Sequence, residues 1–189
     1  MIIGITGGSG TGKSSLAGLL GCEVIDADRV YHKILGENIE LKNELAGRFG
    51  SCERKELADM VFADPNKLDE LNSVTFKYVL AAIEEKISGK GDIAIDAPLL
   101  FESGLNEKCD FTAAVLARND LRIKRIMDRD NLSEEKAKMR INAQKPDEYY
   151  IKKADLILEN NGEDLTDAAQ KLKDMALKAG SQKINRQNR

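Results

Sequence analysis

Residues 7–14, which read GGSGTGKS, have the types and spacing of a phosphate-binding loop. They match the pattern G-x-x-x-x-G-K-[ST], in which glycines let backbone N–H groups turn inward and approach phosphate oxygens without a Cβ in the way. The lysine of this pattern reaches the β- and γ-phosphates of a nucleotide, and the final hydroxyl ligates Mg²⁺. The loop therefore predicts binding of a nucleoside triphosphate together with Mg²⁺.

The residues predicted to hold the nucleotide run from the second loop residue to the residue after the loop. They are Gly8, Ser9, Gly10, Thr11, Gly12, Lys13, Ser14 and Ser15. Lys13 is also a catalytic candidate and Ser14 a metal ligand, because these are the roles of the last two residues of the pattern. The alternative interpretation is a glycine-rich turn followed by a surface lysine.

A basic segment at residues 118–145 holds nine Lys or Arg against five Asp or Glu. Planar guanidinium groups pair bidentately with phosphoryl oxygens, so arginines here can bind the nucleotide. We expect Arg125, Arg129 and Arg140 to contact it, with Arg140 also catalytic, from a helical lid at about 119–145 that closes and excludes water. The alternative is a solvated pair of helices held by ion pairs four residues apart.

Short apolar runs alternate with helical patterns along the chain. We expect strands at 2–6, 22–25, 93–95, 111–116 and 154–158. Alternation of this kind predicts an α/β protein with the P-loop NTPase fold, a five-stranded parallel sheet flanked by helices. The last amphipathic helix should end at Gly180, with a polar tail at 181–189.

The stretch between the second and third strands, residues 29–88, is longer than a simple crossover and has helical spacing. A break is expected near Gly36, and Asp64 with Pro65 predicts a new helix start. We expect an inserted set of helices there, including helices at about 55–90, within a single domain spanning 1–189.

Composition limits the classes of protein that fit. The net charge of −3 argues against a nucleic-acid binder that relies on a basic field. No apolar run approaches the ~20 residues of a membrane span, and Cys22, Cys52 and Cys109 lack the spacing of a zinc site or disulfide framework. We expect a cytoplasmic protein that acts on a small molecule, with no nucleic-acid or membrane partner and an undefined oligomeric state.

Several other segments resemble the dephospho-CoA kinase family. They are VIDAD at 24–28, RKELADMVF at 54–62, APLLFE at 97–102, Arg125, Arg129, Arg140 and Gln144, and Ala154, Asp155 and Asn160. With the loop, the resemblance spans residues 1 to about 162 in the family's order. It implies transfer of the γ-phosphate of ATP to the ribose 3′-hydroxyl of dephospho-CoA, the final step of coenzyme A biosynthesis, with ATP and Mg²⁺ as cofactors.

The sequence departs from the family pattern at three places. Phe76-Lys77 stands where the family usually has His-Pro, in a helix expected to bind the acceptor. Arg122 replaces a glutamine often found three residues before the first lid arginine. Ser9 replaces the commoner isoleucine of the loop.

Carboxylates at the ends of predicted strands are candidates for acid–base and metal chemistry. Asp26 and Asp28 follow the second strand, at the sheet edge where ligands bind in open α/β folds, and residues two apart in an extended segment point the same way. A carboxylate there orients a hydroxyl acceptor and takes its proton. We favour Asp28 as this catalytic base; Asp26 is the alternative, as base or as support for Mg²⁺, and both acids can instead be plain turn or cap residues.

Three more residues complete the candidates. Asp96 follows the third strand and is a metal candidate, holding Mg²⁺ through water, with a plain strand-end acid as the alternative. Glu102 can position a loop by hydrogen bonds to its backbone. His32 is the single histidine and is either an acceptor contact or an exposed helical residue.

Other function classes remain as alternatives. The letters of N-K-x-D occur at 66–69, but in a predicted helix far before the fourth strand, where a guanine-binding motif belongs. A GTPase is therefore disfavoured. A nucleoside or nucleotide kinase and a non-catalytic nucleotide-binding regulator stay open.

Overall fold

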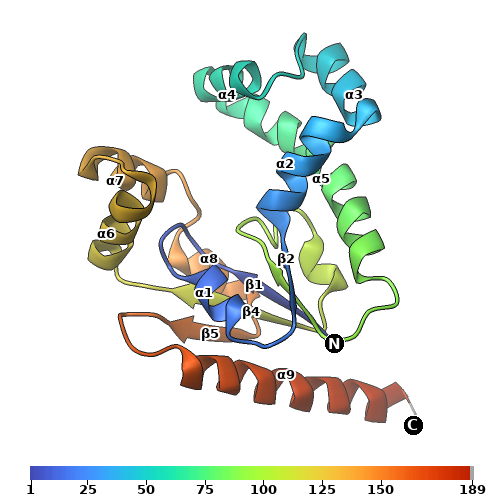
Figure 1. Ribbon diagram of the computed structural model, residues 1–189, viewed down its shortest axis with the longest axis vertical. Helices are drawn as coiled ribbons and strands as arrows, with labels where there is room; N and C mark the ends of the chain where they lie inside the picture. Colours follow the sequence, from blue (N-terminus) through green and yellow to red (C-terminus); the bar gives the residue numbers. More distant parts are fainter. Residues whose placement is uncertain (188–189) are drawn as a thin grey trace. The chain divides into compact units, whose positions relative to one another are not determined.

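The structure, a computed structural model, describes the backbone of residues 1–187 and the side chains of that range except those of Phe62, Ala63, Pro65 and 182–187. Within this range five strands form one sheet in the order β2-β3-β1-β4-β5 (Figure 1). Their bounds are β1 Ile2–Thr6, β2 Glu23–Asp26, β3 Ile93–Asp96, β4 Phe111–Leu116 and β5 Leu156–Glu159. β1 pairs in parallel with β3 and β4, and β4 pairs in parallel with β5. The predicted five-stranded parallel sheet is confirmed.

The chain divides into two compact units. One contains Met1–Ile25 and the chain from Gly91 onward, and the other is Asp26–Lys90. The first unit holds the sheet and the phosphate-binding loop, and the second is helical.

One face of the sheet in the first unit is covered by helices α1 (Lys13–Gly18) and α9 (Thr166–Gln187). Their Leu16 and Leu172 are fully buried against alternate strand residues such as Ile5 and Val115. Figure 1 shows α9 as a long helix beside β5. It continues through Gly180, so the helix end predicted there is wrong; a single glycine costs a helix only about 1 kcal/mol relative to alanine. Of the predicted tail, residues 188–189 lie outside the described residues.

The opposite face of the sheet carries a short helix that the sequence did not predict. Helix α8 (Asp147–Lys153) packs Tyr150 against Ala114 and Leu116 of β4. A 3₁₀ turn, Leu105–Lys108, also contacts the sheet. Successive β4 residues point to opposite faces, as the pleat of a strand requires.

Helices α6 (Asn119–Asp130) and α7 (Glu134–Asn142) form the basic pair in the first unit. Ser133 caps α7 by accepting a hydrogen bond from the Lys136 N–H. Asn131, at φ 51°, ends α6 in the left-handed region and turns the chain toward α7.

The helical unit Asp26–Lys90 consists of α2 (Ala27–Glu37), α3 (Ile39–Phe49), α4 (Arg54–Ala63) and α5 (Pro65–Ile87). Its core is apolar and lies among these helices; it includes Leu35, Leu41, Leu45, Leu57 and Val74. The predicted helix start at Asp64 is confirmed, since its carboxylate accepts from the Asn66 N–H at 2.9 Å. The break predicted near Gly36 is confirmed: it lies two residues further on, at Asn38, whose side chain accepts from the Leu41 N–H at 2.8 Å and starts α3.

No helix within residues 1–187 is both long and apolar enough to cross a membrane. All three cysteines are free thiols. Burial raises the pKa of the Cys109 thiol to about 12, so this cysteine behaves as a small apolar side chain.

Candidate active site

The loop at 7–14 lies between β1 and α1 and has a backbone that requires glycine at fixed places. Gly7 and Gly12 have φ values of 135° and 95°. A Cβ on Gly7 would lie 2.2 Å from the Val115 carbonyl oxygen, and one on Gly12 would lie 2.1 Å from Asn160 Nδ2. The glycines therefore give the loop its close contacts with β4 and with the chain after β5.

Lys13 is nearly buried, with 9% of its surface exposed. Its Nζ donates to the Gly8 carbonyl oxygen at 3.0 Å, and Thr11 Oγ1 donates to the same oxygen at 2.9 Å. The ammonium group is thus held across the loop instead of extending into solvent.

Ser14 and Asp96, the two predicted metal residues, are brought together although 82 residues separate them. Ser14 Oγ donates to Asp96 Oδ2 at 2.5 Å. Asp96 ends β3 and is 5% exposed. Paired hydroxyl and carboxylate oxygens are hard donors of the kind that Mg²⁺ prefers.

A pocket of about 530 Å³ opens beside the loop. Seven residues predicted to bind the nucleotide line it: Gly10, Gly12, Lys13, Ser14, Ser15, Arg125 and Arg129. Four lining residues were not predicted to bind it: Asn160, Gly162, Glu163 and Leu165. These come from the chain after β5, which carries no local motif beyond the asparagine noted in the family resemblance.

Four residues predicted to bind the nucleotide do not line this pocket among the described residues: Gly8, Ser9, Thr11 and Arg140. Gly8 and Thr11 form hydrogen bonds within the loop, and the Ser9 N–H donates to Gln144. The position of Arg140 is explained by its ion pair, described below.

Arg125 is tied to the loop through Asn160. Its Nη1 donates to the carbonyl oxygens of Gly10 at 3.2 Å and Asn160 at 3.1 Å, and its Nη2 donates to Asn160 Oδ1 at 3.1 Å. Asn160 is 6% exposed and donates from Nδ2 to the Thr11 carbonyl oxygen at 2.8 Å. Asn160 therefore fixes the loop and the guanidinium at the same time.

Arg129 and Arg140 meet at one carboxylate, that of Asp130. Arg129 donates to it from Nε and Nη2, each at 2.8 Å, and Arg140 Nη1 also donates to it. The Arg129 hydrogen bonds, followed by the charges of both arginines, lower the pKa of Asp130 to about 2. The same contact raises the pKa of Arg129. Asp130 thus holds two guanidinium groups side by side, 60% and 46% exposed.

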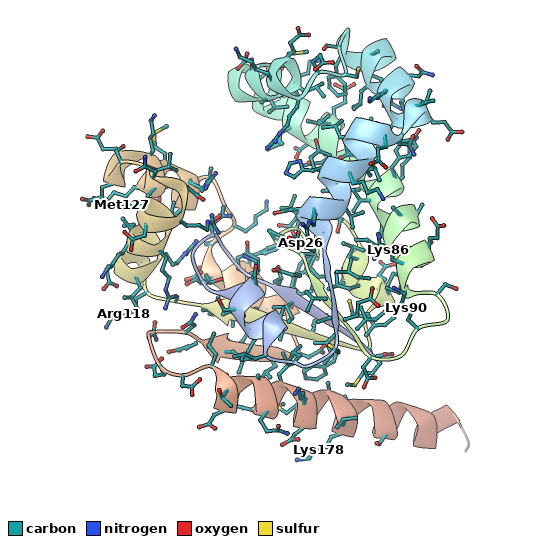
Figure 2. All side chains as sticks on the ribbon, viewed as in Figure 1. Asp26, Lys86, Lys90, Arg118, Met127 and Lys178 are labelled. Carbon is teal, nitrogen blue, oxygen red and sulfur yellow. The ribbon has the colours of Figure 1, made fainter. Side chains whose placement is uncertain are left out.

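Asp26 and Asp28 lie in the unit Asp26–Lys90. Asp26 lies where β2 gives way to α2 (Figure 2). Its carboxylate caps α2 by accepting a hydrogen bond from the Arg29 N–H at 2.9 Å. Asp28 is exposed in the first turn of α2. The expectation that both share one extended segment is therefore wrong, because the cap turns the chain into a helix immediately after the strand.

Glu102 and His32 are the last two candidates from the sequence. Both carboxylate oxygens of Glu102 are buried without a hydrogen-bond partner among the described residues, so the loop-positioning contacts suggested for it are not formed. His32 is exposed on α2 beside Tyr31, with ring centroids 5.4 Å apart.

Comparison with known proteins gives one family. The model of the family described as dephospho-CoA kinase matches residues 1–166. The chain belongs to this family. A relative named dephospho-CoA kinase from Fusobacterium nucleatum subsp. nucleatum is 36% identical over 174 residues, covering 85% of this chain and 90% of the relative. One from Geobacillus kaustophilus is 33% identical over 178 residues, covering 86% and 89%. The predicted resemblance to the dephospho-CoA kinase family is confirmed.

Solved structures agree with this assignment and with the predicted fold. The dephospho-CoA kinase from Campylobacter jejuni superposes with a TM-score of 0.59 at 30% identity and covers 100% of this chain and 98% of its own. A Thermus thermophilus protein gives 0.75 at 35% identity, covering 94% and 97%. A shikimate kinase from Acinetobacter baumannii, at 16% identity and a TM-score of 0.56 over 94% and 93%, shares the fold alone. The predicted P-loop NTPase fold is confirmed.

Proposed function

We propose that this protein transfers the γ-phosphate of ATP to the ribose 3′-hydroxyl of dephospho-CoA and so produces CoA. The observation that carries the proposal is membership of the dephospho-CoA kinase family over residues 1–166. An intact phosphate-binding loop that borders a pocket of about 530 Å³ supports it. This size lies within the range of about 300–1,000 Å³ typical of small-molecule sites.

Lys13, Arg125 and Arg129 supply the positive charge for the ATP phosphates. All three line the pocket. Phosphoryl transfer concentrates charge on the phosphoryl oxygens, so fixed cations stabilise the transition state more than the bound substrate. The contacts of Arg125 with Gly10 and Asn160 keep its guanidinium in place before the nucleotide binds.

Ser14 and Asp96 are the residues that would hold Mg²⁺. Their adjacent oxygens fit this ion, which binds to one or two protein oxygens and completes its coordination with waters and substrate phosphates. The described residues include no cluster of three or more His, Cys, Asp or Glu that could form an all-protein cage. When bound, Mg²⁺ neutralises charge on the β- and γ-phosphate oxygens.

Asp28 is our proposed catalytic base. A ribose hydroxyl must lose its proton during transfer, and a carboxylate within hydrogen-bond reach can accept it. Asp28 is exposed at the N-terminal turn of α2, where the helix dipole favours an ionised carboxylate. One oxygen of the alternative, Asp26, already accepts the capping hydrogen bond from Arg29.

The remaining roles go to the two sets of helices. We assign acceptor binding to the unit Asp26–Lys90, with helices at about 55–90 as its main contacts. We assign to α6 and α7 the role of a lid over ATP at about 119–145, with Arg140 brought to the phosphates on closure. A cytoplasmic location fits a small-molecule kinase that draws on cellular ATP.

The test is an ADP-release assay with purified protein, ATP, Mg²⁺ and a panel of hydroxyl acceptors. We expect turnover with dephospho-CoA to exceed that with nucleosides or nucleoside monophosphates by orders of magnitude, with the new phosphate at the 3′-oxygen by mass spectrometry. Faster turnover with a nucleoside would contradict the assigned acceptor. ATP binding without turnover on any acceptor would indicate a regulator instead of an enzyme.

A further inference from the structure

Ser9, the third residue of the phosphate-binding loop, is held by two side chains that come from far along the chain. Arg122 Nε donates to the Ser9 carbonyl oxygen at 3.0 Å. The Ser9 N–H donates to Gln144 Oε1 at 2.8 Å, and Gln144 Nε2 donates to Ser9 Oγ at 3.1 Å. Each polar group of Ser9 is therefore engaged by Arg122 or Gln144.

Arg122 is the buried centre of this contact, with 4% of its surface exposed. Its Nη2 donates to Gln144 Oε1 at 3.2 Å and its Nη1 donates to Asn119 Oδ1 at 3.3 Å. Nη1 also lies 3.7 Å from Asp147 Oδ1. Arginine is almost never fully buried unless it is paired, so this set of partners keeps the guanidinium in one position.

The guanidinium packs directly on the loop backbone. A Cβ added to Gly8 would lie 2.2 Å from Arg122 Nη2, and one added to Gly10 would lie 2.7 Å from the Arg122 carbonyl oxygen. The loop from Gly8 to Gly10 thus follows the surface of α6. A change of the Arg122 side chain would remove its contacts with Gly8 and Ser9, whereas the backbone contact at Gly10 would remain.

Neither Arg122 nor Gln144 lines the pocket beside the loop. They can therefore affect nucleotide affinity only by changing the conformation of the loop. The N–H groups of the loop must be oriented toward the phosphates before the nucleotide binds. Misplacement of a site by about 1 Å can cost on the order of 10²-fold in rate.

We propose that Arg122, acting with Gln144, is a positioning residue of this kinase. The two side chains fix Gly8 and Ser9 in the phosphate-binding conformation, and they join α6 and the chain after α7 to the loop. The inference rests on the proposed phosphoryl transfer, but it concerns ATP affinity, which is measured without an acceptor.

The experiment compares ATP binding by isothermal titration calorimetry, with Mg²⁺ and no acceptor, in the wild type, Arg122→Met, Arg122→Lys and Gln144→Ala. Arg122→Met keeps the length of the side chain and removes its donors. We expect its Kd for ATP in this titration to rise about tenfold or more, the scale for hydrogen bonds to a charged group, and its KM for ATP in steady-state assays with dephospho-CoA to rise by a similar factor. The KM for dephospho-CoA should stay within about twofold, and Arg122→Lys, with the charge but fewer donors, should be intermediate.

Lys124→Gln is the matched control, because Lys124 is exposed on the same helix. It should leave ATP affinity unchanged. The double variant Arg122→Met/Gln144→Ala should lose less affinity than the sum of the single changes, since both side chains act on Ser9.

A folded Arg122→Met protein with a Kd for ATP within about twofold of wild type would overturn the proposal, and so would fully additive losses in the double variant. If Arg122→Met does not fold, as judged by circular dichroism, Arg122→Lys and Gln144→Ala replace it as the test. A Kd for ATP within about twofold of wild type in both of these variants would then overturn the proposal. If the wild type binds ATP but does not phosphorylate dephospho-CoA, the proposed function fails while the inference about Arg122 stands.

Discussion

At the scale of single residues, Lys13 is the side chain whose loss should damage catalysis most directly. It lines the pocket and is held across the loop by the Gly8 carbonyl. We predict that Lys13→Ala lowers the rate of transfer by at least about 10²-fold, the scale for losing one electrostatic donor to a transition state. Initial rates of ADP release measure this, with circular dichroism as the folding control. Turnover like the wild type's by a folded variant would remove Lys13 from the active site.

Asn160 should matter for stability as well as for nucleotide binding. Asn160→Ala leaves the Thr11 carbonyl and the Arg125 guanidinium without their buried partner. We predict a loss of about 1–3 kcal/mol in the free energy of unfolding, the usual cost of an unsatisfied buried polar group. Urea denaturation measures it. Asn142→Ala, at an exposed position on α7, is the control and should change stability by less than about 0.5 kcal/mol. Equal effects would mean that the Asn160 contacts are not the cause.

Single residues also show what a sequence can and cannot predict about this site. The loop was predictable because its eight residues are contiguous and each type has a fixed role. The Ser14–Asp96 pair was predictable because both follow strands of one parallel sheet, whose carboxyl ends lie at the same edge. The sequence did not predict that Arg122, Gln144 and Asn160 hold the phosphate-binding loop. Their contacts with the loop join residues more than 100 positions apart and follow no periodic pattern.

At the scale of elements, we expect the charged side chains of helices α6 and α7 to differ in role, some acting on the nucleotide and others only contacting solvent. Arg140 pairs with Asp130 on the neighbouring helix, whereas Lys138 pairs with Glu134 on its own helix. We predict that Arg140→Ala lowers kcat/KM for ATP by up to about 10³-fold, the scale for an arginine that stabilises phosphoryl transfer. Lys136→Ala and Lys138→Ala should have little effect, because exposed ion pairs contribute little. Similar losses in all three variants would show that α7 is only a charged surface.

The contact between α6 and α7 should also depend on pH. Arg129 lowers the pKa of the Asp130 carboxyl from 3.8 to about 2 in the folded protein. Ionised Asp130 therefore favours the folded state above about pH 4, and this contribution is lost as the pH falls toward 2. We predict that the stability difference between wild type and Asp130→Asn shrinks between pH 4 and pH 2. Chemical denaturation across this range measures it, and a difference that does not vary with pH would contradict the assignment.

Helix boundaries were predicted correctly where a capping side chain marks them, and the boundary at Gly180, predicted from the glycine alone, was wrong. Asp64 was predicted to start a helix and caps α5. The helix predicted to end at Gly180 continues through that residue. The capping side chain of Asn38, not the weak helix propensity of glycine, decides where α2 gives way to α3.

At the scale of the whole molecule, the two compact units should respond to different ligands. We predict that ATP with Mg²⁺ slows amide hydrogen exchange in residues 7–15 and in α6, within the first unit. Dephospho-CoA should slow exchange mainly within Asp26–Lys90. Local protection of this kind reports which elements a ligand stabilises. Protection of the first unit alone by both ligands would contradict the assignment of acceptor binding to the helical unit.

The parallel sheet was predictable from the alternation of strands and helices, because each strand is a short apolar run. The division into Met1–Ile25 with Gly91 onward and Asp26–Lys90 is a property of packing. This division depends on which apolar helix faces pack together, such as those that carry Leu41 and Val74 in the helical core. The spacing of apolar residues along the sequence does not specify which faces pack together.

The most direct test of the account is single-turnover transfer from γ-labelled ATP to dephospho-CoA at saturating ATP and Mg²⁺, in the wild type, Asp28→Asn and Asp26→Asn. The account predicts label at the 3′-oxygen of CoA in the wild type. It predicts a fall of at least about 10²-fold for Asp28→Asn, because general-base catalysis is typically worth ~10²–10⁴-fold, and a smaller fall for Asp26→Asn. Absence of labelled CoA with the wild type, or an Asp28→Asn rate within a few-fold of it, would contradict the account.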